Sequence, residues 1–109
     1  MEHVVFAMKS GDLEPSLQIA CSGASGDFNA VESWRVVGRQ AGEILFTDED
    51  PDVDVQTPGL AVISHRWEAG ETDVLGPIEI EAVAVWIGGR EQTFPPEGFS
   101  KVWIFESID

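Results

Sequence analysis

Cysteine, histidine and tyrosine are scarce in this chain of 109 residues. It contains one cysteine, Cys21, two histidines, His3 and His65, and no tyrosine. A single cysteine excludes an internal disulfide framework, and one thiol with two imidazoles supplies too few soft ligands for a zinc site. We therefore expect no metal and no disulfide, in a protein made in the cytoplasm.

Basic residues are also few. Six Lys and Arg stand against 20 Asp and Glu, which gives a formal net charge of −14. Such a balance argues against a surface that neutralises the phosphates of nucleic acid or the headgroups of anionic lipid. We expect neither nucleic acid nor a membrane as a partner.

Long apolar runs are missing. The longest, at residues 77–87, is interrupted by Glu79 and Glu81, and nothing approaches the roughly 20 apolar residues that cross a bilayer. The opening Met1-Glu2-His3 lacks the basic start of a signal peptide, and the apolar run at 4–8 is too short for its hydrophobic region. The sequence therefore predicts a soluble protein without an export signal.

Helical periodicity is nearly absent, whereas short β-branched and aromatic runs recur between Gly, Pro and Asp clusters. Hydrophobic residues make up 43 % of the chain, enough for one core, and the length suits one domain over residues 1–109. The pattern predicts an all-β antiparallel sandwich of about seven strands. The expected strand segments are 4–8, 15–21, 34–38, 43–47, 60–67, 77–87, 90–94 and 101–105, with Gly88-Gly89 as a hairpin turn.

The predicted core follows from the apolar side of each strand. Four tryptophans fall on separate strand segments, where each can bury a large area. We expect most of them in the core and leave one aromatic side chain as a candidate interface anchor. The expected core residues are Leu17, Ile19, Ile63, Trp67, Ile78, Ile80 and Trp86.

An acidic segment, DEDPDVD at residues 48–54, carries an aspartate at Asp48, Asp50, Asp52 and Asp54. Alternating aspartates can present oxygen ligands to calcium, but a calcium loop that begins at Asp50 needs glycine at its sixth position and glutamate at its twelfth. This chain has valine and alanine there. We interpret the segment as a solvated loop, with calcium binding as the alternative.

Glu79 and Glu81 point to one side of their predicted strand, and paired carboxylates can perform acid–base chemistry when one is desolvated. We interpret them as solvating groups on a wet sheet face. His65 shares a predicted face with Ile63 and Trp67, which favours a hydrogen-bonded core or subsurface histidine over a catalytic base or a ligand.

Cys21 continues the apolar stripe of Leu17 and Ile19, with no basic group nearby in the sequence to activate it. The small-residue segment SGASG at 22–26 has neither nucleophile-elbow spacing nor the lysine of a phosphate-binding loop. We therefore expect no enzymatic activity, no catalytic residues and no cofactor.

Several short motifs stand out along the chain. They are HRWEAGETD at 65–73, GPI at 76–78, VWIGGREQTFP at 85–95 and GF at 98–99, with KSGDLEPSL at 9–17 and GDF at 26–28. These motifs resemble those of small immunoglobulin-like domains in tailed-bacteriophage virions, similar to the amino-terminal domain of the baseplate upper protein. The resemblance implies an immunoglobulin-like sandwich. It also implies a non-enzymatic virion part, of the baseplate or tail or a free-standing protein of the capsid and connector region.

We therefore expect a structural protein of the virion that docks to other capsid or tail proteins, in several symmetric copies, through a sheet edge or an apolar rim. The expected contact residues are Val4 and Phe6 in an edge strand, and Phe94 and Phe99 beside chain breakers. Phe94 or Phe99 capping the core is the alternative for that pair. Two other functions stay open, an acidic DNA-mimic inhibitor of a host nucleic-acid-binding enzyme and a carbohydrate-binding sandwich.

Overall fold

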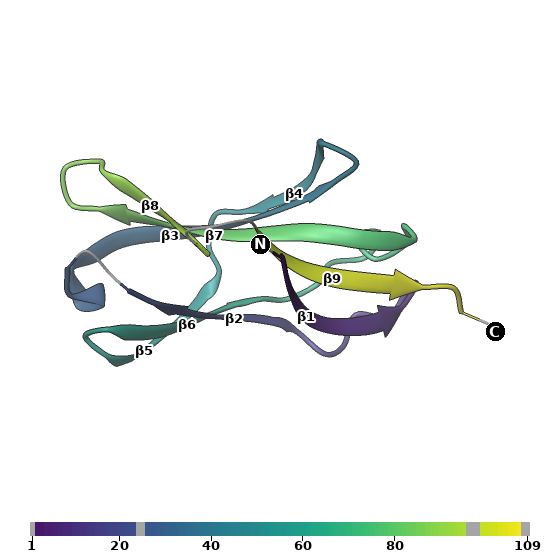
Figure 1. Cartoon of the computed structure of the whole chain (residues 1–109), viewed down its shortest axis with the longest axis horizontal. Helices are drawn as coiled ribbons and strands as arrows, with labels where there is room; N and C mark the ends of the chain where they lie inside the picture. The colour runs from purple at the N-terminus through teal and green to yellow at the C-terminus, as the bar shows by residue number, and fades with distance from the viewer. Residues whose placement is uncertain (1, 24–25, 96–98, 108–109) are drawn as a thin grey trace.

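Nine strands and one short 3-10 turn make up the described chain (Figure 1). The structure, a computed structural model, describes residues 2–23, 26–95 and 99–107, with side chains left out at 2–6 and 99. The all-β prediction is confirmed. The elements are β1 (Glu2–Lys9), β2 (Leu17–Ser22), η1 (Phe28–Ala30), β3 (Val31–Gln40), β4 (Glu43–Asp48), β5 (Asp52–Thr57), β6 (Leu60–His65), β7 (Gly76–Trp86), β8 (Glu91–Phe94) and β9 (Phe99–Phe105).

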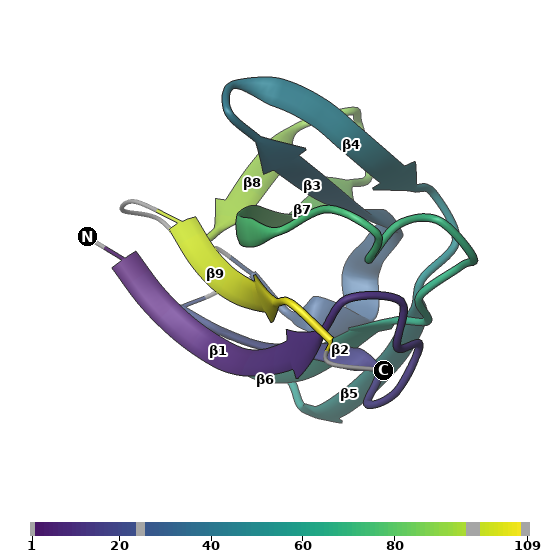
Figure 2. The same cartoon turned by 90° about the vertical axis from the view of Figure 1, so that its right-hand side faces the viewer.

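The strands form two sheets. The larger has the order β1-β9-β7-β3-β4 with β8 also paired to β7, and the smaller has the order β2-β6-β5. Figure 2 shows the larger sheet as a curved layer with β2, β6 and β5 beneath it. Apart from β1, this order is that of an immunoglobulin-like sandwich, with β4, β3, β7 and the last strand facing β2, β6 and β5.

Two departures from a simple sandwich concern the ends of the larger sheet. The last strand is divided, because β8 pairs with the second half of β7 and β9 pairs with the first half. In addition, β1 lies parallel to β9 at the edge of the larger sheet. The first strand therefore extends the larger sheet, and β2 is left as an edge of the smaller one.

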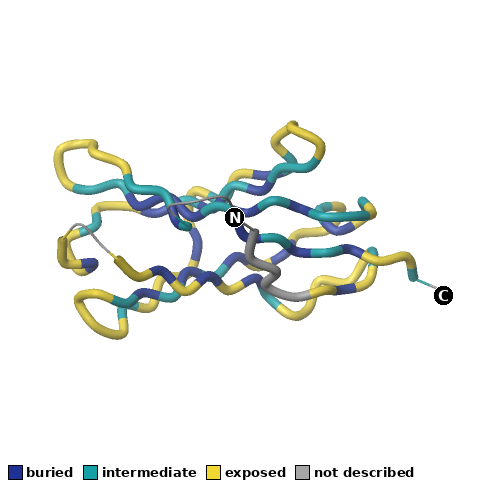
Figure 3. The backbone as a smooth tube through the Cα atoms, in the orientation of Figure 1, coloured by how far each residue is buried: buried dark blue, intermediate teal, exposed yellow. Residues whose placement is uncertain are grey.

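The core lies between the sheets, where alternate residues of β2, β6 and much of β7 are buried (Figure 3). Leu17, Ile19 and Ile63 come from the smaller sheet, and Ile78 and Ile80 come from the larger. These five and Trp67 confirm the predicted core. Trp86, the seventh predicted member, lies at the end of β7 and is only partly buried against the core.

The acidic segment departs from its prediction. Asp48 ends β4, and Asp52 and Asp54 belong to β5, so only residues 49–51 connect two strands. Val53 pairs with Ile63, and Asp54 pairs with Val62. The alternation that suggested calcium ligands is therefore the period of an edge strand, and the prediction of a loop over 48–54 was wrong in its second half.

The predicted hairpin and its positive-φ glycines are confirmed, with φ of 95° at Gly88 and 86° at Gly89. The turn is longer than the two residues predicted, because the Trp86 amide donates to the Arg90 carbonyl and residues 87–89 lie between them. Loops at the opposite end are also fixed, since the Trp67 indole donates to the Pro15 carbonyl at 3.0 Å.

The described residues include no helix that is long and apolar enough to span a membrane.

Candidate functional site

His65 is a buried polar residue whose imidazole contacts two carboxylates and two aromatic rings. It ends β6, and its ring is 4 % exposed. Its Nδ1 lies 2.6 Å from Asp48 Oδ2, and its Nε2 lies 2.9 Å from Glu71 Oε1. A carboxylate only accepts hydrogen bonds, so a ring nitrogen that carries a proton donates to the carboxylate that it faces.

Neighbouring elements hold this cluster of His65, Asp48 and Glu71 in place. The ring of Phe46 stacks on the imidazole with centroids 4.3 Å apart and planes inclined by 9°. The ring of Trp67 meets the imidazole edge-on at 5.3 Å. On the far side, the Glu68 amide donates to Glu71 Oε1 at 2.8 Å, which fixes the glutamate in its turn.

The geometry limits what the cluster can do chemically. Both ring nitrogens of His65 face a carboxylate, at 2.6 Å and 2.9 Å, so both are already engaged by protein side chains. Among the described residues, no three His, Cys, Asp or Glu side chains are arranged to hold a metal ion. The prediction of a hydrogen-bonded subsurface histidine is confirmed.

A hollow of about 300 Å³ opens beside the cluster. It brings together acidic side chains from the 48–54 segment and from the loop after β6, which the sequence alone could not place near each other. Arg66 lies on its wall, with Nε 3.5 Å from Asp52 Oδ2. The lining residues are Asp48, Asp50, Pro51, Asp52, Ser64, His65, Arg66 and Glu68.

Cys21 is buried in β2 at 1 % exposure. Burial raises the pKa of its thiol to about 12, because the apolar surroundings disfavour the thiolate. A thiol held in its protonated form is a poor nucleophile. The prediction that Cys21 behaves as a small hydrophobe is confirmed by its place in the core.

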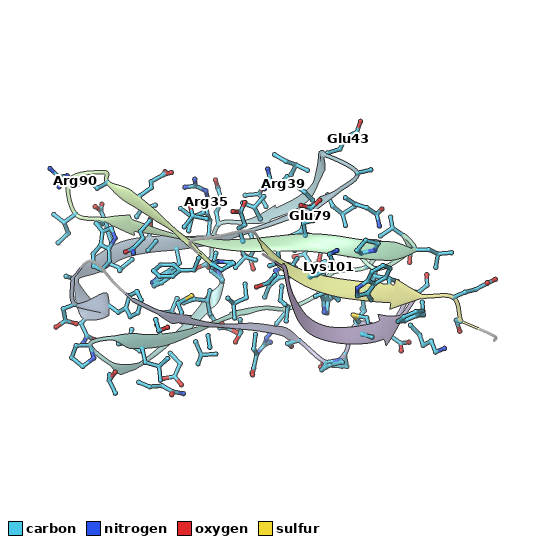
Figure 4. All side chains as sticks on the ribbon, in the orientation of Figure 1. Arg35, Arg39, Glu43, Glu79, Arg90 and Lys101 are labelled. Atoms are coloured by element: carbon cyan, nitrogen blue, oxygen red, sulfur yellow. The ribbon has the colours of Figure 1, made fainter. Side chains whose placement is uncertain are left out.

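The outward face of the larger sheet carries ion pairs between strands, and Figure 4 shows where Arg35, Arg39, Glu79 and Lys101 lie on it. Arg35 of β3 donates twice to Glu91 of β8, across β7, with both distances at 3.0 Å, and this contact lowers the pKa of Glu91. Arg39 Nη2 donates to Glu81 Oε1 at 2.6 Å. In the sheet register, Glu79 lies between Arg39 and Lys101. Both glutamates therefore lie among cations, in the place where the sequence predicts solvating groups.

Aromatic residues continue this face along β9. Lys101 Nζ lies 5.5 Å from the centroid of the Trp103 ring, and Trp103 stacks on Phe105 at 6.3 Å. Phe105 is 50 % exposed. We call the surface formed by these side chains the paired face; its residues are Arg35, Arg39, Glu79, Glu81, Glu91, Lys101, Trp103 and Phe105.

The predicted contact residues fall in three places. Phe94 is buried, with its ring centroid 5.7 Å from that of Phe28 and 6.1 Å from that of Trp34, so it caps the core and offers no exposed contact. Chain breakers after Phe94 ended the strand without turning its side chain outward. Val4 and Phe6 lie in edge strand β1, and Phe99 begins β9, but their side chains lie outside the described part of the structure.

Sequence reasoning missed the partners of His65 and the ion pairs of the paired face. Arg35 and Glu91 are 56 positions apart, and His65 and Asp48 are 17 apart. The one available signal was the set of basic residues, since five of the six (Lys9, Arg35, Arg39, Arg90 and Lys101) lie in the strands or hairpins of the larger sheet.

No protein-family model matches this chain, and no curated protein matches it. We therefore infer function from the fold, the surfaces and the motifs described above.

Proposed function

We propose that this protein is a non-enzymatic structural component of a tailed-bacteriophage virion, which docks to other capsid or tail proteins. Its immunoglobulin-like strand order is what the resemblance of its motifs to small phage domains implies. The resemblance of the motifs supports a place in the virion. The chemistry of the paired face supports docking to other proteins.

The observation that carries the proposal is the charge balance of the paired face. The chain as a whole has a net charge of −14, yet this face carries three of its six basic residues, Arg35, Arg39 and Lys101. They lie beside the carboxylates of Glu79, Glu81 and Glu91, and Glu49 lies next to Arg35. Its aromatic side chains, Trp103 and Phe105, are of the types enriched in protein interfaces. A partly aromatic face where cations offset most of the carboxylates is where a protein partner can approach a polyanion with little net repulsion.

A second candidate is an acidic inhibitor that imitates DNA. The hollow beside His65 favours it, because carboxylates from two separate segments, including Asp50 and Glu68, meet there. Against it, Glu79 and Glu81 lie on the other sheet beside Lys101 and Arg39. The carboxylates therefore do not form one stripe of the kind that would follow a duplex backbone.

Composition of purified phage particles tests the proposal. We expect mass spectrometry to detect this protein in particles at a fixed copy number relative to the major capsid or tail protein. Replacing Trp103 and Phe105 by Ser should reduce incorporation, whereas replacing exposed Glu43 by Gln should not. If particles contain none of the protein and a pull-down from infected cells recovers a host nucleic-acid enzyme, the DNA-mimic function takes its place.

A further inference from the structure

Among the described residues five strands have a free edge, and four of them, β1, β4, β5 and the short β8 with Glu91, carry charged residues. β1, β4 and β5 are edge strands, and each contains charged residues: Glu2 and Lys9 in β1, Glu43 and Asp48 in β4, and Asp52 and Asp54 in β5. Each of these three also has a register shift in its pairing with its neighbour. Charges and bulges on an edge discourage the addition of another strand.

The remaining edge, β2, has neither charges nor a register shift. Its sequence, LQIACS, contains no charged residue and no proline, and it lies within a stretch without charge from residue 15 to residue 26. Its six residues pair with β6 in an uninterrupted register from Leu17 opposite His65 to Ser22 opposite Leu60. A straight, uncharged edge strand of this kind is open to pairing with another chain.

The backbone of β2 has hydrogen-bonding capacity left over. In an antiparallel pair, alternate residues direct their N–H and C=O groups away from the partner strand. Within residues 2–23, 26–95 and 99–107, β2 has β6 as its backbone partner, besides a long contact of 3.9 Å from the Cys21 thiol to the Ile19 carbonyl. Six extended residues offer an edge of about 20 Å.

The surface next to this edge is uncharged as well. Gln18, Ala20 and Ser22 are exposed on the outward side of β2, and they lie beside Ser64, Val62 and Leu60 of β6. None of these six residues bears a charge, on a protein with a net charge of −14.

We propose that the β2 edge pairs with the β2 edge of a second copy of this chain, antiparallel and related by a two-fold axis. The proposal deepens the docking role and rests on it. A two-fold contact brings each strand against itself. At β4 or β5, that arrangement would set aspartate or glutamate against aspartate or glutamate, whereas at β2 it sets uncharged residues against uncharged residues.

The net charge sets the direction of the salt dependence. Two copies, each at −14, repel one another, and added salt screens that repulsion. Self-pairing through β2 therefore strengthens as the salt concentration rises. Binding of a basic partner to the acidic surface would weaken under the same change.

Sedimentation equilibrium of the full chain under reducing conditions, between low salt and about 0.5 M NaCl, tests this pairing. Ala20 is exposed on β2, so Ala20→Glu and Ala20→Lys leave the core intact, which a melting curve checks. Because like charges meet across the two-fold axis, each variant alone should have a dimer Kd raised about tenfold or more. An equimolar mixture of the two variants should restore dimers. Thr47→Glu and Thr47→Lys on edge strand β4 are the matched controls and should leave the dimer Kd unchanged.

Two results would overturn the self-pairing. One is a monomer at every salt concentration, and the other is a dimer that Ala20→Glu leaves intact. Neither result touches the docking role, which particle composition tests separately. A monomeric protein whose Ala20→Glu variant no longer enters particles would assign the β2 edge to a strand of another virion protein instead.

Discussion

The ring of Phe46 lies directly against the backbone of Gly38. A Cβ atom placed on Gly38 would come within 2.2 Å of Phe46 Cε2, far inside van der Waals contact. The same Phe46 ring also stacks on the imidazole of His65. Because Gly38 has no side chain, the Phe46 ring of β4 has room to pack against the buried imidazole of His65.

Gly38→Ala should destabilise the fold by about 1–3 kcal/mol, because the added methyl group must displace Phe46. Urea unfolding measures the change. Gly59→Ala is the matched control: a Cβ there meets nothing within 4 Å, so its free energy of unfolding should stay within about 0.5 kcal/mol of the native value. Equal stability of Gly38→Ala and the native protein would show that the ring moves aside at no cost.

His65→Phe should lower the free energy of unfolding by about 2–4 kcal/mol, since it keeps an aromatic ring beside Phe46 but leaves two carboxylates without their donor. Adding Asp48→Asn and Glu71→Gln to this variant removes both unpaired charges and should recover part of the loss. Chemical denaturation of the three proteins supplies the comparison. A triple variant that is less stable than His65→Phe would contradict this account.

Because of Cys21, the free energy of unfolding should decrease as pH rises through the alkaline range. Its folded-state pKa is raised, so the folded protein binds the thiol proton more tightly than the unfolded chain does. The contribution is complete below the ordinary thiol value near 9 and is lost as pH rises toward about 12. The slope is at most about 1.4 kcal/mol per pH unit.

Cys21→Ala provides the control for this slope. It lacks the thiol but retains every other ionisable group of the chain. The difference in free energy of unfolding between the two proteins should therefore shrink as pH rises from 9 to 12. Parallel pH profiles would mean that the thiolate is not disfavoured by the fold.

Arg35→Gln should raise the pKa of Glu91, because the hydrogen bonds from Arg35 are the main cause of its lowered value. Carboxyl titration by NMR measures this shift directly. Since the folded-state pKa is lowered, the contribution of the pair to stability is present above the ordinary glutamate pKa and is lost as pH falls through the folded value. Arg66→Gln, on the other sheet, should leave the titration of Glu91 unchanged.

Local patterns predicted the elements of this fold better than its contacts. Alternating apolar residues located β2, β6 and β7, and Gly88-Gly89 located the hairpin between β7 and β8. The same period two in the aspartates of 48–54 leaves a solvated loop and calcium binding as the two interpretations, whereas Asp52 and Asp54 belong to β5. A period of two shows that the two sides of a strand carry different types of residue. It does not show whether the polar side binds a ligand or only faces solvent.

The partners of the site required the folded chain. Asp48 and Glu71 approach His65 from opposite sides because β4 and the loop after β6 meet at one end of the sandwich. Nothing at either position in the sequence marks it as a histidine partner. The proline after Phe94 does not determine whether the Phe94 ring points inward or outward. The packing of the ring on Phe28 and Trp34 places it inside the core.

The parallel pairing of β1 with β9 has a consequence for the order of events during synthesis. β1 leaves the ribosome before the eight other strands of this domain, and β9, the strand to which it hydrogen-bonds, leaves after all of them. Until β9 is made, β1 has no partner strand, so the larger sheet cannot be completed before residue 99 and those after it are available. Contacts between such distant segments slow folding and lengthen the exposure of unpaired strands. We therefore expect the larger sheet to close only once β9 has left the ribosome, and a chain stalled before residue 99 to depend on chaperones for its solubility.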